Sequence, residues 1–150
     1  MLTPGSQAPA ISLTNQLGAV VDLASLRGRR VLIFFYPKAS TPGCTQQACA
    51  LRDIVGEVGG TVIVGISPDS QAAQRKFADK FNLGYDLLTD TDHAAGEAYG
   101  VWQEKNMYGK KYMGIVRSAF LVDSEGRIEQ VWYKVSPADT AKNLLAAVAK

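Results

Sequence analysis

The chain has 150 residues, of which 47% are hydrophobic and 20% are charged, and its formal net charge is +2. These values are ordinary for a globular protein and predict one domain over residues 1–150. The basic residues are scattered, so no basic patch indicates a nucleic-acid partner. The longest apolar run is too short to cross a bilayer, and the first residues lack the regions of a signal peptide. We therefore expect a cytoplasmic protein without membrane association.

Two cysteines, Cys44 and Cys49, and a single histidine, His93, restrict the possible chemistry. The cysteines do not form a C-x-x-C redox motif, and together with one histidine they cannot supply four zinc ligands. We therefore expect no metal and no cofactor. In a reducing compartment a close cysteine pair is more often catalytic or redox-sensing than structural. The alternative is that both are small buried apolar residues.

The first part of the chain predicts extended segments before the cysteines. Residues 3–9 predict an irregular arm, and the alternating runs 11–13 and 20–23 predict a β-hairpin. A helical turn is expected at 24–28. The apolar run 31–35 predicts a fully buried strand, because its residues are β-branched, aromatic or leucine.

Strands and helices alternate through the rest of the chain. Apolar spacing and stop signals predict, in order, a helix from Pro42 to about Val58, a strand at 61–66, a helix from about Ser70 through Lys80, an extended segment at 85–88, a helix at 93–99, a surface loop at 101–112, a hairpin of strands 119–122 and 128–133, and a last helix capped by Ser136. This order predicts an α/β, thioredoxin-like fold, with a central mixed sheet flanked by helices and an N-terminal β-hairpin extension.

The helix after the buried strand opens with a thiol. Thr41 is a candidate N-cap residue, Pro42 occupies the first helical position, and Cys44 stands three residues after the cap. A thiol there lies over unpaired N–H groups at the positive end of the helix dipole, which favours the reactive thiolate. Gly43 leaves room for a substrate to approach the backbone. The alternative is an ordinary capped helix whose third residue happens to be cysteine.

The spacing of the two cysteines predicts a conformational change if they pair. Five residues of ideal helix place the Cα atoms of Cys44 and Cys49 about 8–9 Å apart. A disulfide needs Cα atoms within about 7 Å. The first turns of the helix would therefore have to unwind before these cysteines could bond.

The segment Pro37-x-x-x-Thr41-x-x-Cys44 resembles the active-site motif of the peroxiredoxins. A longer pattern is similar to the bacterioferritin comigratory protein (peroxiredoxin Q) branch. Its further parts are Tyr36, Pro42-Gly43, Thr45, Ala48-Cys49, Arg52-Asp53, Gly65-Ile66-Ser67-Pro68-Asp69-Ser70, Leu87-Leu88-x-Asp90, Gly100-Val101-Trp102 and Arg117-Ser118-x-Phe120. The resemblance extends over nearly the whole chain.

The resemblance implies a thiol-dependent peroxidase that reduces hydrogen peroxide and organic hydroperoxides. Cys44 would attack the hydroperoxide and become a sulfenic acid, and Cys49 would resolve it as an intramolecular disulfide. Thr41 would hydrogen-bond peroxide and thiolate, and Pro37 would shield the pocket. Arg117 would favour the thiolate and stabilise charge on the peroxide oxygens. Thioredoxin or a similar dithiol donor would recycle the enzyme, which we expect to be a monomer.

Gln47 departs from the family pattern, which often carries glutamate there, and we expect a modest effect on tuning. Two other functions stay open from the residues. One is a thioredoxin-like disulfide oxidoreductase, against which the missing C-x-x-C argues. The other is a redox-sensing module whose helix unwinding is read by a partner. His93 is expected to be a surface residue at a helix start.

Overall fold

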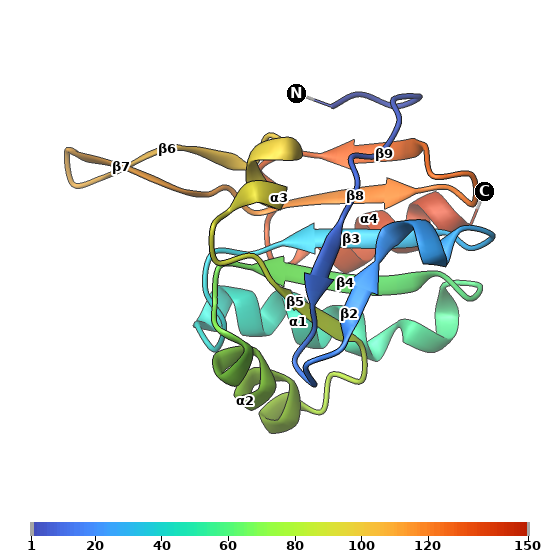
Figure 1. The fold of residues 1–150 in the computed structure, drawn as a ribbon, viewed down its shortest axis with the longest axis horizontal. Coiled ribbons are helices and arrows are strands. Elements are labelled where there is room, and N and C mark those ends of the chain that lie inside the picture. The colour runs from blue at the N-terminus through green and yellow to red at the C-terminus, as the bar shows by residue number, and fades with distance from the viewer. Residues whose placement is uncertain (1, 150) are drawn as a thin grey trace.

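A computed structural model describes residues 2–149 and centres on a five-stranded mixed sheet (Figure 1). The strand order is β5-β4-β3-β8-β9, in which β3, β4 and β5 run parallel and β8 runs antiparallel to both β3 and β9. The strands are β3 (Val31–Phe35), β4 (Val62–Ser67), β5 (Asp86–Thr89), β8 (Ser118–Val122) and β9 (Ile128–Trp132).

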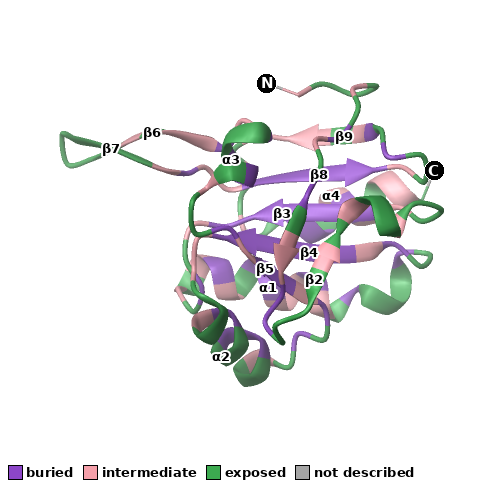
Figure 2. Ribbon diagram, in the orientation of Figure 1, coloured by how far each residue is buried: buried purple, intermediate pink, exposed green. Residues whose placement is uncertain are grey.

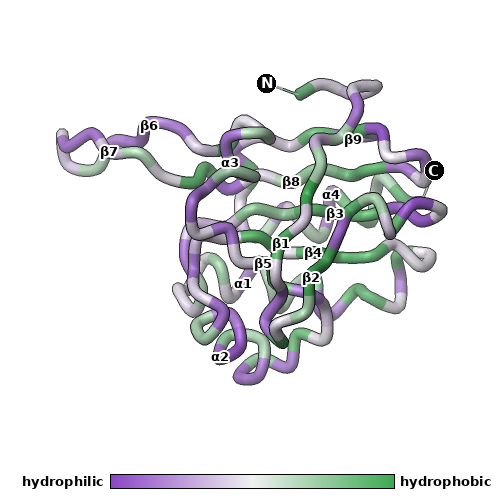
Figure 3. Tube along the Cα trace, viewed as in Figure 1, coloured by the Kyte–Doolittle hydropathy of each residue, from purple (hydrophilic) through white to green (hydrophobic). Residues whose placement is uncertain are grey.

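The central strand β3 is buried along its whole length, as its apolar run predicts (Figure 2). Successive side chains point to opposite faces of a sheet, so β3 feeds two separate hydrophobic clusters. Leu32 and Phe34 belong to one cluster, and Ile33 and Phe35 belong to the other. Figure 3 shows that β3, β4 and β8, which supply this core, are largely hydrophobic.

Helices cover both faces of this sheet. The first cluster includes residues of α1 (Pro42–Asp53), α2 (Gln71–Phe81) and α4 (Asp139–Val148). The second includes residues of α3 (Ala94–Ala98) and packs against the hairpin of β1 (Ser12–Thr14) and β2 (Val20–Asp22), followed by the 3-10 turn η1 (Leu23–Leu26). The predicted α/β architecture, with its mixed sheet and N-terminal hairpin, is confirmed. Within residues 2–149 no helix has the length and apolarity needed to span a membrane.

The prediction of a surface loop at 101–112 is wrong. This segment belongs to a two-stranded antiparallel hairpin of β6 (Trp102–Met107) and β7 (Lys110–Ile115), which projects beyond the sheet (Figure 1). Most of its residues are exposed or half-buried, so they lack the apolar alternation that marks a strand packed on a core. The hairpin is hydrophilic along β6 (Figure 3).

Two helix boundaries differ from the sequence prediction. Helix α1 ends at Asp53, where a 3-10 turn, η2 (Val55–Glu57), replaces the predicted continuation to Val58. Helix α4 begins at Asp139, although the predicted cap contact is present, because Ser136 Oγ accepts a hydrogen bond from the Asp139 N–H at 3.1 Å. Residues 137 and 138, between Ser136 and Asp139, form a turn that precedes the regular helix.

Candidate active site

The site lies where the carboxyl end of β3 meets the beginning of β8. The register pairs Phe35 with Ser118, so the connection from β3 to α1 and the residue before β8, Arg117, emerge at the same edge of the sheet. Two segments that lie far apart in the sequence therefore meet beside the start of α1. The backbone N–H of Val135 donates to the Arg117 carbonyl at 2.9 Å, which brings the approach to α4 to the same edge.

The connection between β3 and α1 is held by hydrogen bonds of its own. Asp69 Oδ2 accepts from the Ala39 N–H at 2.7 Å, and Ser40 adopts a positive φ of 65° that turns the chain toward the helix. Thr41 occupies the N-cap position, but its hydroxyl donates to the Lys38 carbonyl at 2.8 Å and caps no helical N–H. The predicted N-cap position of Thr41 is confirmed, but its side chain bonds within the tight loop and not to the helix.

Cys44 and Arg117 meet directly at this edge. Arg117 Nη1 lies 3.4 Å from Cys44 Sγ, and Cys44 itself is almost completely buried, with 1% of its surface exposed. A Cβ atom placed on Gly43 would lie 3.2 Å from Arg117 Nη2 and 3.5 Å from Pro137 Cγ. The glycine thus lets the guanidinium lie close against the first turn of α1. A positive group beside a thiol at a helix start favours the thiolate.

A buried hydrogen-bond chain supports the guanidinium from behind. The same Nη1 donates to Gln47 Oε1 at 2.8 Å, and Gln47 Nε2 donates to Thr140 Oγ1 at 2.9 Å. Thr140 Oγ1 in turn donates to the Ser136 carbonyl at 3.1 Å. The sequence had singled out Gln47 as a departure from the family pattern, but nothing in it indicated Thr140, whose contact depends on how α1 and α4 pack.

Lys105, on the projecting hairpin, is a second cation near the site. Its Nζ donates to the Ile115 carbonyl at 2.8 Å. Burial and the neighbouring Arg117 charge lower the pKa of Lys105, and the nearby Cys44 opposes that effect. The sequence prediction missed this residue because it placed the segment in an unstructured loop.

Two further predicted site residues, Cys49 and Pro37, form no side-chain hydrogen bond with Cys44. Cys49 is half-buried on α1, and both cysteines are free thiols. Pro37 is half-buried, two residues after the end of β3. Tyr36, which lies between the end of β3 and Pro37, is fully buried. Its hydroxyl donates a hydrogen bond to Gln74 Oε1. Burial raises the pKa of Tyr36 far above its ordinary value, so this phenol stays protonated.

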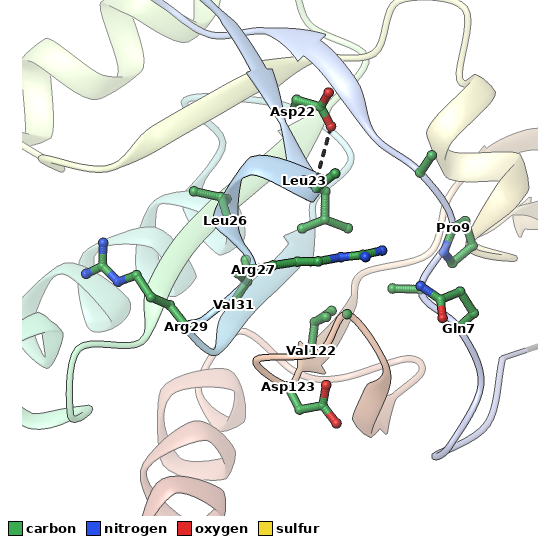
Figure 4. A pocket seen from close by; sticks show the side chains of 14 residues that line it. Gln7, Pro9, Asp22, Leu23, Leu26, Arg27, Arg29, Val31, Val122 and Asp123 are labelled. Atoms are coloured by element: carbon green, nitrogen blue, oxygen red, sulfur yellow. Dashed lines mark hydrogen bonds between the residues drawn. The ribbon is translucent and has the colours of Figure 1, made fainter.

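A separate cavity lies on another part of the molecule. It has a volume of about 320 Å³ and is lined by the N-terminal arm, η1 and the adjoining ends of β3 and β8 (Figure 4). Arg27 extends across it toward Pro9 (Figure 4). None of the predicted site residues lines this cavity. The candidate active site is therefore identified from the contacts around Cys44 and not from this cavity.

Comparison with known proteins gives consistent relatives. Residues 4–131 match the model of the AhpC/TSA family. The chain is 48% identical over 133 residues to peroxiredoxin Bcp of Escherichia coli, a match that covers 87% of this chain and 85% of that protein. A putative peroxiredoxin bcp of Haemophilus influenzae is 48% identical over 140 residues, or 92% of this chain and 90% of the relative.

Solved structures agree with these relatives. The bacterioferritin comigratory protein of Xanthomonas campestris, described with respect to its alkyl peroxide reduction activity, superposes with a TM-score of 0.91. The two sequences are 36% identical, and the match covers 98% of each chain. The chain therefore belongs to the AhpC/TSA family and is a thiol-dependent peroxidase of its Bcp branch.

Proposed function

We propose that Cys44 is the peroxidatic nucleophile of this peroxidase, and the observation that carries the proposal is its contact with Arg117. A guanidinium nitrogen 3.4 Å from the sulfur stabilises the thiolate and can hydrogen-bond a peroxide oxygen at the same place. The helix start adds N–H groups that point toward the reacting atoms. These donors are already in place, so little reorganisation accompanies the reaction.

The reaction moves negative charge from sulfur to oxygen. The Cys44 thiolate attacks the terminal oxygen of the hydroperoxide, an S–O bond forms, and the O–O bond breaks. The leaving alkoxide or hydroxide takes up a proton and departs as an alcohol or water. Arg117 stabilises the charge on both the sulfur and the leaving oxygen. The oxygen of Thr41 accepts the hydrogen bond of the bound hydroperoxide, Gly43 leaves the backbone accessible, and Pro37 shields the pocket from water.

Cys49 resolves the sulfenic acid in this proposal. Its thiolate attacks the Cys44 sulfur, an S–S bond forms, and the S–O bond breaks with loss of hydroxide, which solvent protonates to water. Both residues lie within α1, so the first turns of that helix must unwind first. Thioredoxin or a similar dithiol then reduces the disulfide.

The proposed cycle also bears on assembly and location. Because both reacting cysteines belong to one helix, resolution needs no second subunit, which supports a monomer acting as a single domain over residues 1–150. Both cysteines must be thiols at the start of each cycle, which supports a reducing compartment such as the cytoplasm.

Intact-protein mass spectrometry tests nucleophile, resolving residue and pairing together. One equivalent of hydrogen peroxide should convert the wild type to a monomer lighter by two hydrogen atoms. Cys49→Ser should instead gain one oxygen and react with a sulfenic-acid reagent such as dimedone. Cys44→Ser should remain unchanged. If Cys44→Ser kept full peroxidase activity, the assignment of the nucleophile would be wrong.

A further inference from the structure

The beginning of α4 holds the first half of α1 in place. Pro137 Cγ lies 3.5 Å from the position that a Cβ atom on Gly43 would occupy, and Gln47 donates to Thr140 at 2.9 Å. Gln47 and Thr140 are both buried, with exposed fractions of 0% and 1%. In such surroundings the loss of one polar partner leaves the other buried group without a hydrogen bond, which is unfavourable.

The direction of each hydrogen bond in this chain follows from Thr140. A carbonyl can only accept, so the single hydroxyl proton of Thr140 goes to the Ser136 carbonyl. The Thr140 oxygen must then accept from the amide nitrogen of Gln47. The amide oxygen of Gln47 is thereby directed to Arg117, whose Nη1 reaches Cys44. Thr140 thus fixes the orientation of the neutral side chain that supports the active-site cation.

The second half of α1 is held by different contacts. The Tyr85 hydroxyl donates to the Ala48 carbonyl at 2.7 Å, and Arg52 Nη1 donates to the Phe81 carbonyl at 2.6 Å. The segment 42–47 is therefore bonded to α4 and Arg117, whereas Ala48 and Arg52 are bonded to Tyr85 and Phe81, between the end of α2 and the start of β5. The boundary between the two sets of contacts falls between Cys44 and Cys49.

We propose that Thr140 is a positioning residue that controls how long the Cys44 sulfenic acid remains in the folded first half of α1. The inference rests on the proposed roles of Cys44 and Cys49. Disulfide formation requires residues 42–47 to leave α4, which breaks the hydrogen bond between Gln47 and Thr140. The bond from Tyr85 to Ala48 keeps the second half, with Cys49, in place while the first half unwinds toward it.

Two reactions then compete for the sulfenic acid. In the unwound helix, Cys49 forms the disulfide and releases water, as described above. In the folded helix, the sulfenate takes an oxygen from a second hydroperoxide, which is reduced to an alcohol or water, and Cys44 becomes a sulfinic acid. The ratio of disulfide to sulfinic acid follows the ratio of unwound to folded helix. A stronger hydrogen bond from Gln47 to Thr140 favours the folded helix and therefore the sulfinic acid.

Thr140→Val tests this control, because valine keeps the shape of threonine and removes the hydroxyl. Disulfide formation after one equivalent of peroxide should become about 3–10-fold faster, as expected for the loss of about one buried hydrogen bond. The first oxidation of Cys44 should become several-fold slower, since Arg117 loses its support. The fraction of sulfinic acid at excess hydrogen peroxide should fall. Stopped-flow tryptophan fluorescence and intact-protein mass spectrometry measure these quantities.

Thr140→Ser is the matched control, since it keeps the hydroxyl and removes only the methyl group. It should restore the wild-type ratio of disulfide to sulfinic acid. If the serine and valine variants changed that ratio equally, or if neither changed it, the proposal would be overturned. Should the valine variant fail to fold, Thr140→Ala removes the same hydroxyl without adding apolar volume.

A measurement without peroxide separates this proposal from the proposed function. In the reduced protein, Thr140→Val should raise amide hydrogen exchange about 3–10-fold in residues 45–47 and leave residues 50–53 unchanged. Equal exchange in both segments would contradict the division of α1. A failure of the cysteine roles would appear instead in the wild-type mass experiment, while this exchange pattern would persist.

Discussion

A single guanidinium nitrogen of Arg117 serves two acceptors at the active site. Nη1 lies 3.4 Å from Cys44 Sγ and 2.8 Å from Gln47 Oε1, so its position relative to the sulfur depends on the amide. Gln47 orients the cation without neutralising it, whereas a glutamate at this position would place a negative charge beside it. In the proposed cycle, the full positive charge of Arg117 therefore remains available to the sulfur and the peroxide.

Replacement of Arg117 should separate its charge from its geometry. Arg117→Met removes both donor and charge, and we expect the reaction of Cys44 with hydrogen peroxide to slow by about 10²–10³-fold, the usual effect of losing one preorganised donor. Arg117→Lys keeps the charge but lacks the planar fork, so its rate should lie between the two. Stopped-flow oxidation in a Cys49→Ser background measures the step. A methionine variant as fast as the parent would remove Arg117 from the mechanism.

Gly43→Ala should impair the reaction without unfolding the protein. The new Cβ would lie 3.2 Å from Arg117 Nη2, which forces the guanidinium to shift by a few tenths of an ångström. We expect a several-fold slower first oxidation and an unchanged or higher melting temperature, since alanine favours helix over glycine by about 1 kcal/mol. Gly56→Ala is the matched control, because a Cβ there meets no heavy atom within 4 Å in the described part of the chain. Equal rates for both variants would contradict the role of Gly43.

The sequence predicted some site residues better than others, and the reasons are physical. The helix start at Cys44 is local information, readable from Thr41, Pro42 and the preceding strand. Arg117 lies 73 residues away, so only the family resemblance could associate it with the thiol. Its contact follows from the pairing of β3 with β8. Thr140 had no signal of either kind, because its role depends on the packing of two helices.

The hairpin β6–β7 shows where the alternation of apolar and polar residues fails to predict strands. Its strands project into solvent and bury no continuous face, so the residues need not alternate between apolar and polar. Its turn was equally hard to recognise. Tyr108 and Gly109 have φ values of 53° and 79°, which are typical of a type I′ turn, but that turn usually carries asparagine before glycine.

Tyr108→Asn should stabilise this hairpin. Tyr108 is 99% exposed, so its side chain contributes little packing, and asparagine accepts a positive φ more readily than tyrosine does. We expect amide hydrogen exchange of the cross-strand N–H groups in β6 and β7 to slow about 2–5-fold, an effect of the size typical for turn residues. Gly109→Ala should act in the opposite direction because alanine strains at positive φ. Faster exchange in the asparagine variant would contradict the turn assignment.

For the molecule as a whole, the order of strands and helices predicted the layers but not the boundaries. The alternation of strands and helices up to β5, followed by the hairpin of β8 and β9 and a last helix, indicated a mixed sheet with helices on both faces. The end of α1 was not readable, since Gly59 and Gly60 terminate the segment after η2 rather than the helix itself. Both cysteines lie within α1 at its observed length as well as at its predicted length, so the proposed cycle does not depend on this boundary.

Buried phenols tie the stability of the whole fold to alkaline pH. Tyr36, Tyr85 and Tyr99 are buried, and burial raises the pKa of each far above the ordinary value of 10.0. Above pH 10 the unfolded chain releases these protons while the folded protein retains them. The free energy of unfolding must therefore fall as pH rises, with no effect of these groups below pH 10.

The fall should reach about 1.4 kcal/mol per phenol for each pH unit above 10, or about 4 kcal/mol for the three at pH 11. That is a large part of the roughly 5–15 kcal/mol that stabilises a typical domain, so unfolding is expected near pH 11–12.

Urea unfolding between pH 8 and 11.5 measures how steeply the free energy of unfolding falls with pH. Tyr99→Phe should lower the overall stability, since it loses the 2.7 Å hydrogen bond to the Pro9 carbonyl. It should also reduce the fall of the unfolding free energy above pH 10 by the contribution of one phenol. An unaltered slope in Tyr99→Phe would show that the buried ring does not resist ionisation.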